Sequence, residues 1–189
     1  MVVLNKIYTR TGDDGTSALA TGERRAKSDL RFEAIGTIDE LNANVGMARL
    51  HEASLRADLA TMLGPIQNDL FDLGADLATP VRTEKRERLR ITARQVERLE
   101  REIDALNRDL APLTSFVLPG GRPAAAALHL CRTVARRAER LMVALAAGEA
   151  VNAEALRYVN RLSDFFFVAA RLANDAGKAD VLWVPGQNR

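Results

Sequence analysis

The sequence predicts an all-α protein, built as a five-helix bundle that follows a non-helical N-terminal segment. Three observations support this fold class. The composition is 47% hydrophobic but only 5% aromatic, which favours helices over sheets. Five segments repeat apolar residues at helical spacing. A length of 189 residues suits one domain with a core of its own.

Charge and cysteine content exclude several functional classes. The formal net charge is only +2, so a pI near 9.0 does not indicate nucleic-acid binding without clustered basic residues. The single cysteine, Cys131, excludes an internal disulfide and a CxxC metal site, and its apolar neighbours predict a buried side chain. Met1–Ile7 is too short for a signal peptide, and no apolar run approaches about 18 residues. We therefore expect a soluble, cytoplasmic protein with no membrane or nucleic-acid partner.

Residues 1–28 carry no helical pattern. Val2–Leu4 and Lys6–Tyr8 are brief β-prone pieces, and Thr9–Ser17 then combines hydroxyls, glycines and acids. Glycine N–H groups together with Thr and Ser hydroxyls suit a phosphate, although the spacing of a Walker A loop is absent. A flexible tail with an Asp14–Gly15 turn fits this stretch equally well. The basic residues that follow are Arg24, Arg25 and Lys27.

The first two helices are expected at Leu30–His51 and Leu55–Ala78. Ser28 or Asp29 is the expected cap of the first. The first helix places apolar side chains on one face at Phe32, Ile35, Ile38, Leu41 and Val45. The second, which ends before Pro80, does so at Leu59, Leu63, Ile66, Leu70, Leu73 and Leu77.

A charged connector and a third helix follow. Arg82–Arg90 is expected to be a solvated link. Thr92–Gln95 then forms a capping box, with Ile91 and Val96 as a hydrophobic staple. The third helix continues through Val96, Leu99, Ile103 and Leu106.

The fourth helix, Ala124–Leu145, begins after a break that no helix can cross. Phe116–Pro123 ends in Pro-Gly-Gly-Arg-Pro, and Pro123 suits the first turn of a helix. At about 100° per residue, Arg132, Arg136 and Glu139 lie within roughly 60° of one another. Guanidinium groups on one face repel each other unless an anion lies among them. The alternative is a solvated stripe in which Glu139 offsets its basic neighbours.

The fifth helix is expected from Asn152 to about Asp175, with Gly177 as the C′ residue. Its core face comprises Leu156, Val159, Leu162, Phe166 and Ala169, and the run Phe165–Phe167 is typical of core. Asn160 is a candidate ligand contact. The sequence shows no repeat or linker, so residues 1–189 form one expected domain: a non-helical N-terminal segment at 1–28, a helical bundle at 29–177 and a tail at 178–189.

Five motifs in order carry a resemblance to a known family. They are TRTGDDGT (Thr9–Thr16), GTIDELN (Gly36–Asn42), FVLPGG (Phe116–Gly121), RTVARRAER (Arg132–Arg140) and YVNRLSD (Tyr158–Asp164). Together they resemble the PduO-type ATP:cob(I)alamin adenosyltransferases over nearly the whole chain. Ser17-Ala18-Leu19 departs from the Thr-Gly or Thr-Ser pairing usual after the glycine loop.

The resemblance implies a homotrimer with ATP bound at each subunit interface. One subunit would wrap the triphosphate with Thr9, Arg10, Thr11, Gly12, Asp13, Asp14, Gly15, Thr16, Ser17 and Lys27. Its neighbour would complete the site with Arg136, Arg137, Glu139, Arg140 and Asn160. Buried guanidiniums pair bidentately with phosphate oxygens, and Glu139 would either fix these arginines or bind Mg²⁺ on the triphosphate.

The same resemblance implies the reaction, in which the 5′-deoxyadenosyl group of ATP passes to the cobalt of cob(I)alamin and triphosphate leaves. The nucleophile is the reduced cobalamin, which agrees with two histidines and no recognisable triad in the chain. Phe116 would lie under the corrin and displace the lower ligand, giving four-coordinate cob(II)alamin. Arg132 and Asp39 match a salt bridge that closes this face. A reductase or a cobalamin-dependent enzyme is an expected partner.

Two other functions fit parts of the sequence. An all-α nucleoside triphosphate pyrophosphohydrolase needs several acidic residues at helical spacing, which the arginine-rich helix lacks. A non-enzymatic helical module that binds nucleotides or RNA through the arginine stripe would show salt-sensitive binding. This second function would require neither Phe116 nor the glycine loop.

Overall fold

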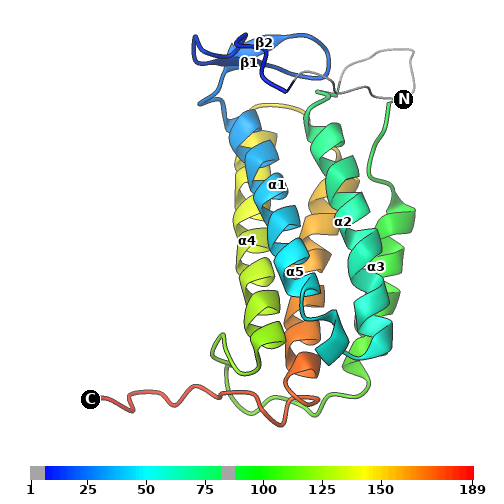
Figure 1. Ribbon diagram of the computed structural model, residues 1–189, viewed down its shortest axis with the longest axis vertical. Helices are drawn as coiled ribbons and strands as arrows, with labels where there is room; N and C mark the ends of the chain where they lie inside the picture. Colours follow the sequence, from blue (N-terminus) through cyan, green and yellow to red (C-terminus); the bar gives the residue numbers. More distant parts are fainter. Residues whose placement is uncertain (1–6, 82–87) are drawn as a thin grey trace.

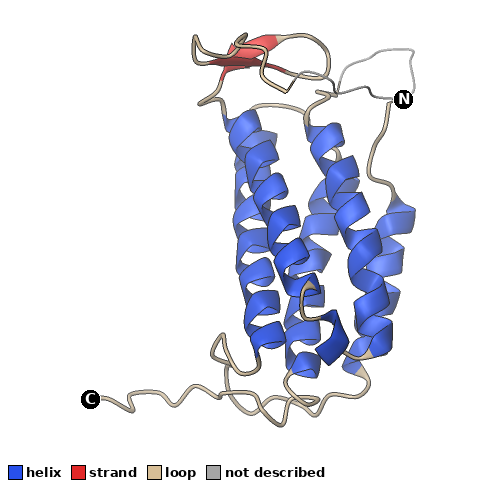
Figure 2. Cartoon of the chain, in the orientation of Figure 1, coloured by secondary structure: helices blue, strands red, loops and turns tan. Residues whose placement is uncertain are grey.

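The computed structural model describes residues 7–81 and 88–189. Within these residues, five α-helices run up and down, and a two-stranded antiparallel hairpin lies at one end (Figures 1 and 2). The predicted all-α bundle with a non-helical N-terminal segment is therefore confirmed. The elements are β1 (Thr16–Ala18), β2 (Arg24–Ala26), α1 (Leu30–Arg49), the 3-10 turn η1 (Glu52–Ser54), α2 (Ala57–Leu77), α3 (Ala93–Asn107), α4 (Pro123–Ala146) and α5 (Ala153–Ala173).

Helix α4 makes the most extensive contacts with two other helices. It packs along α1 on one side and along α5 on the other, while α2 covers α1 and α3 covers α5. Small side chains make the close approach of α4 and α5 possible, because Ala135 and Ala138 of α4 and Ala169 of α5 are fully buried. Phe165 and Phe166 fill the remaining space as an edge-to-face pair with ring centroids 5.6 Å apart.

The helices begin where the sequence places their caps. The Asp29 carboxylate accepts from the N–H of Arg31 at 2.8 Å, which settles the cap of α1. Thr92 and Gln95 form the predicted capping box of α3, and Pro123 occupies the first turn of α4. Asn152 caps α5 by accepting from the N–H of Glu154 at 3.1 Å. Local hydrogen-bond chemistry therefore sets these boundaries.

Two local predictions need correction. Helix α5 ends at Ala173 with Asn174 as its C-cap, so Gly177 is not the C′ residue. The chain leaves the helix through three consecutive residues of positive φ, from Asp175 to Gly177, and the Gly177 N–H reaches back to the Arg171 carbonyl at 2.8 Å. The turn is therefore longer than a one-glycine cap.

The second correction concerns the N-terminal segment, where strands form at β1 and β2 and not at the β-prone pieces. Val2–Leu4 lies outside the described residues, and Ile7 and Tyr8 are in no strand. In the hairpin Thr16 lies opposite Ala26, and the chain reverses at Gly22, whose φ is +84°. Strands of three mostly polar residues show no alternation that a sequence pattern could reveal.

The described end of the charged connector is also less solvated than expected. Arg90 forms an ion pair with the buried Asp76 of α2 at 2.6 Å. The other Asp76 oxygen accepts from the N–H of Ile91 at 2.9 Å and from the Asn152 amide at 2.7 Å. A buried carboxylate needs such partners, so Asp76 fixes the start of α3 and of α5 relative to α2.

The alternation of the helices gives the bundle two distinct ends. At the upper end in Figure 1 lie the hairpin, the start of α1 and the connection from α4 to α5. At the lower end lie the segment between α3 and α4, which contains Phe116, and the C-terminal tail. In the described part of the chain, no helix combines the length and the apolar character needed to span a membrane.

Candidate functional site

At the upper end, the predicted phosphate segment forms a compact loop held by its own hydrogen bonds. One Asp14 carboxylate oxygen accepts from the N–H of Thr16 at 2.9 Å and from the Thr16 hydroxyl at 2.7 Å. These bonds lower the pKa of Asp14. Arg10 and Gly15 both have positive φ, which curls the loop, and the Gly15 carbonyl accepts from the N–H of Lys27 at 2.8 Å. The Asp14 carboxylate is therefore engaged within the loop and maintains its shape.

Two basic side chains flank this loop. A Cβ added at Gly12 would lie only 3.1 Å from the Lys27 amine, so the glycine lets the lysine reach the loop backbone. Arg24 donates to the Thr16 hydroxyl at 3.1 Å and lies 3.5 Å from the Asp14 carboxylate. Lys27 was predicted for this site, but Arg24 was not. The position of Arg24 among the basic residues that follow the loop was a signal that could have identified it. The other predicted members are Thr9, Arg10, Thr11, Asp13 and Ser17, all of which lie on this loop or on β1.

A buried ion-pair network attaches the hairpin to the bundle. The Glu149 carboxylate accepts from Arg25 of β2 at 2.6 Å and from Arg31 of α1 at 2.7 Å. Arg31 is only 1% exposed and also donates to the Leu77 carbonyl at 2.8 Å. The hydrogen bond from Arg25, followed by that from Arg31, lowers the pKa of Glu149. Arg25 is therefore an anchor of the hairpin.

Polar side chains of α4 and α5 meet midway along the bundle. The Glu139 carboxylate accepts from the Asn160 amide at 2.8 Å. Arg136 is exposed beside them, and the Asp164 pKa is raised by burial and, more weakly, by the charge of Glu139. Arg161 donates to Asn160 and to Glu100 of α3, the latter at 2.9 Å. We call Arg132, Arg136, Glu139, Arg140, Asn160 and Asp164 the α4–α5 face.

Not every predicted residue belongs to this face. Arg137 turns toward α1, where it forms an ion pair with Glu40. Arg140 donates to the Arg136 carbonyl at 3.1 Å and so stays beside it. Within the described residues, no hydrogen bond or ion pair joins the N-terminal loop to Arg136, Glu139 or Asn160. Within one chain, the two groups of residues predicted to bind phosphate are therefore not joined by polar contacts in the described residues.

At the lower end, Phe116 borders an apolar pocket of about 560 Å³. The Phe116 side chain is 77% exposed, as expected for a ring that projects from a loop. Phe167 also lines this pocket, whereas the sequence assigned it to the core with Phe165 and Phe166. Three consecutive helical residues spread over about 200°, so they cannot all face one core. The other lining residues are Leu113, Thr114, Ser115, Val117 and Arg132.

A buried histidine lies behind the wall of this pocket. His129 is 1% exposed, and its ring meets Phe167 edge-on with centroids 6.4 Å apart. In residues 7–81 and 88–189 neither ring nitrogen has a hydrogen-bond partner, and the same is true of the Arg132 Nε atom. Burial, then the nearby Arg132 charge, lowers the pKa of His129, which keeps the imidazole neutral. No sequence pattern indicated a role for His129.

The expected pairing of Asp39 with Arg132 does not form within the chain. Asp39 is exposed on α1 beside a groove of about 370 Å³ between α1 and α2. Arg132 lies on α4 and points into the lower pocket, toward α5. The two side chains therefore face different neighbours, and among the salt bridges of the described residues none joins them. A single bundle does not close the lower face in the expected way.

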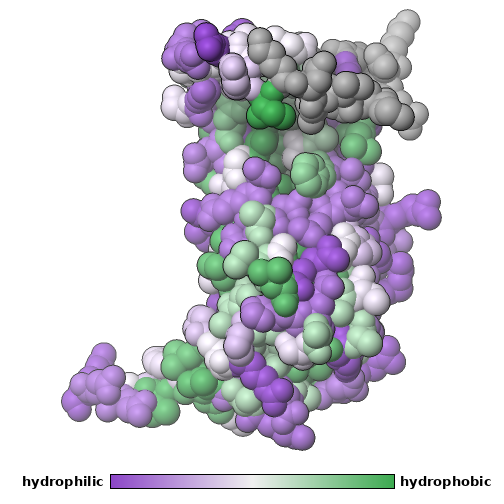
Figure 3. Space-filling view, in the orientation of Figure 1, coloured by the Kyte–Doolittle hydropathy of each residue, from purple (hydrophilic) through white to green (hydrophobic). Residues whose placement is uncertain are grey.

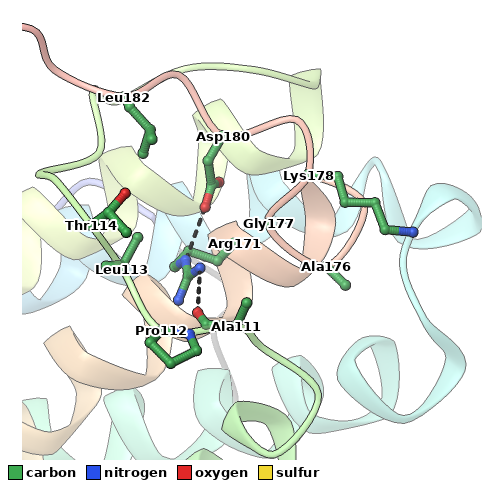
Figure 4. A pocket seen from close by; sticks show the side chains of 10 residues that line it. All are labelled: Ala111, Pro112, Leu113, Thr114, Arg171, Ala176, Gly177, Lys178, Asp180 and Leu182. Carbon is green, nitrogen blue, oxygen red and sulfur yellow. Dashed lines mark hydrogen bonds and ion pairs between the residues drawn. The ribbon is translucent and has the colours of Figure 1, made fainter.

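A second, smaller pocket adjoins the first at the lower end (Figure 4). It has a volume of about 270 Å³, and a buried ion pair forms its floor. Arg171 donates to the Asp180 carboxylate at 2.9 Å and to the Ala111 carbonyl at 3.0 Å. These bonds tie the end of α5 to the C-terminal tail and to the segment that leads to Phe116.

Two further expectations concern nucleophiles and metals. Cys131 is buried, as predicted, and burial raises the pKa of its thiol to about 12, so it is no nucleophile at neutral pH. Across the part of the chain that the structure covers, no three His, Cys, Asp or Glu side chains gather to hold a metal ion.

Known proteins resemble this chain along its length. A family model described as cobalamin adenosyltransferase matches residues 7–173. The corrinoid adenosyltransferase of Mycobacterium tuberculosis strain H37Rv is 49% identical over 191 residues, covering 100% of this chain and 97% of the relative. The corrinoid adenosyltransferase of Bacillus subtilis is 47% identical, covering 89% of this chain and 86% of the relative.

Solved structures give the same comparison. A PduO-type ATP:corrinoid adenosyltransferase from Lactobacillus reuteri, in a phenylalanine-to-histidine variant complexed with cobalamin and ATP, superposes with a TM-score of 0.86. It is 38% identical, and the alignment covers 95% of this chain and 97% of that one. An arginine-to-lysine variant of that protein complexed with ATP gives a TM-score of 0.84 at 38% identity, covering 95% and 100% of the two chains.

Proposed function

The chain belongs to the cobalamin adenosyltransferase family, and from that premise we propose which part of the reaction each group of its residues serves. The enzyme transfers the 5′-deoxyadenosyl group of ATP to the cobalt of reduced cobalamin and releases triphosphate. One observation carries the assignment of residues to ligands. The apolar pocket at Phe116 is lined by Arg132 of α4, and the same helix carries Arg136 and Glu139 of the polar α4–α5 face. One site for a flat apolar ligand thus adjoins one for an anion.

Helix α4 supplies the distance between these two sites. It begins at Pro123 at the lower end and rises about 1.5 Å per residue, so Arg132, Arg136 and Arg140 stand about 14, 20 and 26 Å along it. A triphosphate bound at Arg136 and Arg140 would leave the ribose free to extend down toward the pocket. ATP carries about four negative charges, which guanidiniums pair bidentately.

The N-terminal loop would enclose the triphosphate from the other side. Lys27 and Arg24 supply positive charge there, beside a backbone that curls around Gly12 and Gly15. Because this loop makes no polar contact with the α4–α5 face of its own chain in the described residues, we assign the two halves to neighbouring subunits. A homotrimer would form three such sites.

Mg²⁺ fits the α4–α5 face only as an ion carried by the triphosphate. Glu139 offers a carboxylate that the Asn160 amide orients, and Asp164 lies near enough for its pKa to respond to Glu139. Mg²⁺ is commonly held by one or two carboxylates together with substrate phosphates and water. When bound it would neutralise charge on the leaving triphosphate, while Arg136 and Arg140 hold the phosphate oxygens.

The transfer itself needs no protein nucleophile. The electron pair of Co(I) attacks C5′ of ATP, the cobalt–carbon bond forms, the C5′–O bond breaks and triphosphate leaves with that bonding pair. Cobalt is thereby oxidised from Co(I) to Co(III). The protein supplies orientation and stabilises charge on the leaving group. This division agrees with a buried Cys131 and a neutral, buried His129.

Phe116 prepares the cobalt for this step. Its exposed ring borders the lower pocket, where it would occupy the lower face of the corrin and displace the axial ligand. Four-coordinate cob(II)alamin then accepts an electron more readily, because losing the ligand lowers the energy of the accepting orbital. A reductase supplies that electron, and a cobalamin-dependent enzyme takes the product. Both partners, and a cytoplasmic location, belong to this proposal.

The deciding experiment is a spectral assay with ATP and chemically reduced cobalamin. We expect the absorbance of adenosylcobalamin to appear and one triphosphate to be released per cobalt alkylated. Release of pyrophosphate without cobalamin would instead identify a pyrophosphohydrolase. Tight, salt-sensitive RNA binding without adenosylation would identify a binding module.

The shared site has its own test. Asp39 and Arg132 face different grooves of one chain and would pair across a subunit interface. Mixing inactive Gly12→Ala protein with inactive Arg136→Ala protein should restore part of the activity, because some interfaces then carry two intact halves. An active monomer in sedimentation experiments would contradict this arrangement.

A further inference from the structure

The C-terminal tail runs beside the segment that carries Phe116, and the two form a short antiparallel pair. The N–H of Leu118 donates to the Val181 carbonyl at 2.8 Å, and the N–H of Trp183 donates to the Phe116 carbonyl at 2.8 Å. Val117 and Leu182 form the bridge between these bonds. The Ser115 hydroxyl adds a bond to the Trp183 carbonyl at 2.7 Å. The tail side of this contact, Val181–Trp183, lies beyond residues 7–173, the part that matches the family model.

The side chains of the pair also meet. The rings of Phe116 and Trp183 have centroids 6.0 Å apart at an interplanar angle of 57°, within the usual range for an aromatic pair. Both rings remain accessible, with Trp183 43% exposed. Figure 3 shows hydrophobic residues gathered at the lower end, where the tail leaves the bundle. Trp183 therefore limits where the Phe116 ring can move without covering it.

The start of the tail is held by buried residues that also hold the Phe116 segment. Asp180 accepts from Arg171 at 2.9 Å and from the Asn174 amide at 3.1 Å. The same Asn174 amide donates to the Gly120 carbonyl at 3.2 Å, and its oxygen accepts from the N–H of Arg122 at 2.9 Å. Figure 4 shows Asp180 and Arg171 facing each other across this junction. The end of the Phe116 segment and the beginning of the tail are thus fixed to one point.

The segment between α3 and α4 needs such support. It lies outside any helix, and Phe116 is mostly exposed, so burial does not fix its ring. In the described residues, Phe116 and its neighbour Ser115 make their hydrogen bonds with Trp183 of the tail. A reacting group that is misplaced by about 1 Å can lose about 100-fold in rate. The position of Phe116 therefore depends on a segment about 65 residues later in the sequence.

We propose that Val181–Trp183 clamps the Phe116 segment and that Trp183 is a positioning residue for displacement of the corrinoid's lower ligand. This inference rests on the proposed function of Phe116. The clamp acts through two separable parts: the backbone N–H of Trp183 and its ring. Because the clamp touches only the lower end, ATP binding at the α4–α5 face does not depend on it.

Two substitutions separate the parts of the clamp. Trp183→Pro removes both the ring and the N–H that donates to Phe116, so its difference from Trp183→Ala isolates the N–H, and Leu182 before it already has the extended conformation that proline favours. Trp183→Ala keeps that N–H and removes the ring, and Trp183→Phe restores an aromatic ring. Val184→Pro is the matched control, since Val184 lies just beyond the pair and precedes Pro185.

The readout is the electron paramagnetic resonance signature of four-coordinate cob(II)alamin in the presence of ATP. We expect Trp183→Pro to lose most of it, Trp183→Ala to lose part, and Trp183→Phe and Val184→Pro to keep it. Rates from cob(II)alamin should fall about tenfold or more in Trp183→Pro, while rates from cob(I)alamin fall less than about threefold. The Kd for ATP and the Tm should stay near those of the wild type.

Other outcomes would overturn the clamp. A chain truncated after Asp180 that keeps the full four-coordinate signature shows that the tail does not position Phe116. A truncated chain with raised activity shows that the tail obstructs the pocket. Equal losses from both cobalt states, with a lowered Tm, show a structural role only. If the wild type forms no adenosylcobalamin at all, the proposed function fails first, and that result is distinct from these.

Discussion

The two ends of the bundle attach their non-helical segments by the same device. At the upper end, buried Arg31 of α1 pairs with Glu149, which also binds Arg25 of the hairpin. At the lower end, buried Arg171 of α5 pairs with Asp180 of the tail. In both cases a buried helical arginine is compensated by a carboxylate from a non-helical segment, Glu149 of the α4–α5 connection or Asp180 of the tail.

What the two segments present is different. The hairpin loop displays hydroxyls and the cations Arg24 and Lys27. The lower segment and tail display the apolar rings Phe116 and Trp183. The difference teaches that attachment and ligand chemistry are independent in this fold. One end is suited to an anion and the other to a flat apolar ligand, and the arginines of α4 lie between them.

The largest effect is expected between the two ends, at Arg136 of α4. Arg136→Ala should lower ATP-dependent activity about 100-fold or more, because a guanidinium that stabilises the leaving triphosphate is lost. The free energy of unfolding should change by less than about 0.5 kcal/mol, since Arg136 is exposed. Steady-state rates and thermal unfolding measure both quantities. Arg157→Ala removes an exposed arginine of α5 and should leave activity intact. Unchanged ATP dependence in Arg136→Ala would return this residue to a solvated stripe.

The next effect concerns the lower end alone. Phe116→Ala should lower the rate from cob(II)alamin about tenfold or more but the rate from cob(I)alamin less than about threefold, because only the first requires loss of the lower ligand. With 77% of the side chain exposed, stability should change little. Leu118→Ala shortens an exposed apolar neighbour and is the control. Equal losses from both cobalt states, together with a lowered Tm, would mean that Phe116 only closes the end of the bundle.

The sequence predicts the bundle better than its ends. Helix periodicity and the caps at Asp29, Thr92 and Asn152 are local signals, and the structure follows them. The hairpin and the pairing of Val117 with Leu182 are long-range contacts between short segments, which leave no local period. Their existence depends on where the bundle brings the chain.

The residues of the site were likewise predicted only in part from the sequence. The arginines of α4 and the position of Phe116 follow from spacing and from the break at Pro119–Gly121. Phe167 and His129 were missed, because which side of a helix faces a cavity is decided by its neighbours. The expected Asp39–Arg132 contact was absent in the described chain for the same reason, since α1 and α4 present them to different grooves.

A third prediction tests the attachment at the upper end. Glu149→Gln leaves Arg31 buried beside a neutral amide, so the free energy of unfolding should fall by about 1 to 3 kcal/mol, the lower part of that range reflecting partial exposure of Glu149. Because the folded pKa of Glu149 is lowered, its contribution is present above the unfolded value of 4.5 and is lost as pH falls through the folded pKa. Denaturant unfolding at pH 7 and pH 4 measures this. Glu154→Gln, which loses an ion pair with the exposed Arg157, is the control, and an equal loss in it would contradict the network.

The smallest effect should come from His129 at the lower end, which contrasts with the satisfied network above. Its pKa is lowered from 6.5 by burial and by Arg132, while Asp180 acts weakly in the opposite direction. The unfolded chain therefore binds a proton at a higher pH than the folded protein does. By linkage, stability is complete above about pH 6.5 and falls as pH drops toward the folded pKa.

His129→Gln removes this titration without adding a charge. The loss of stability between pH 8 and pH 5 should be smaller in the variant than in the wild type, by about 1 kcal/mol at most. His51→Gln changes the other histidine of the chain, at the end of α1, and should keep the wild-type slope. If His129→Gln keeps that slope too, the imidazole finds a partner on protonation. The lower end would then hold its polar groups as well satisfied as the upper end does, and the contrast between the two ends would be limited to their ligands.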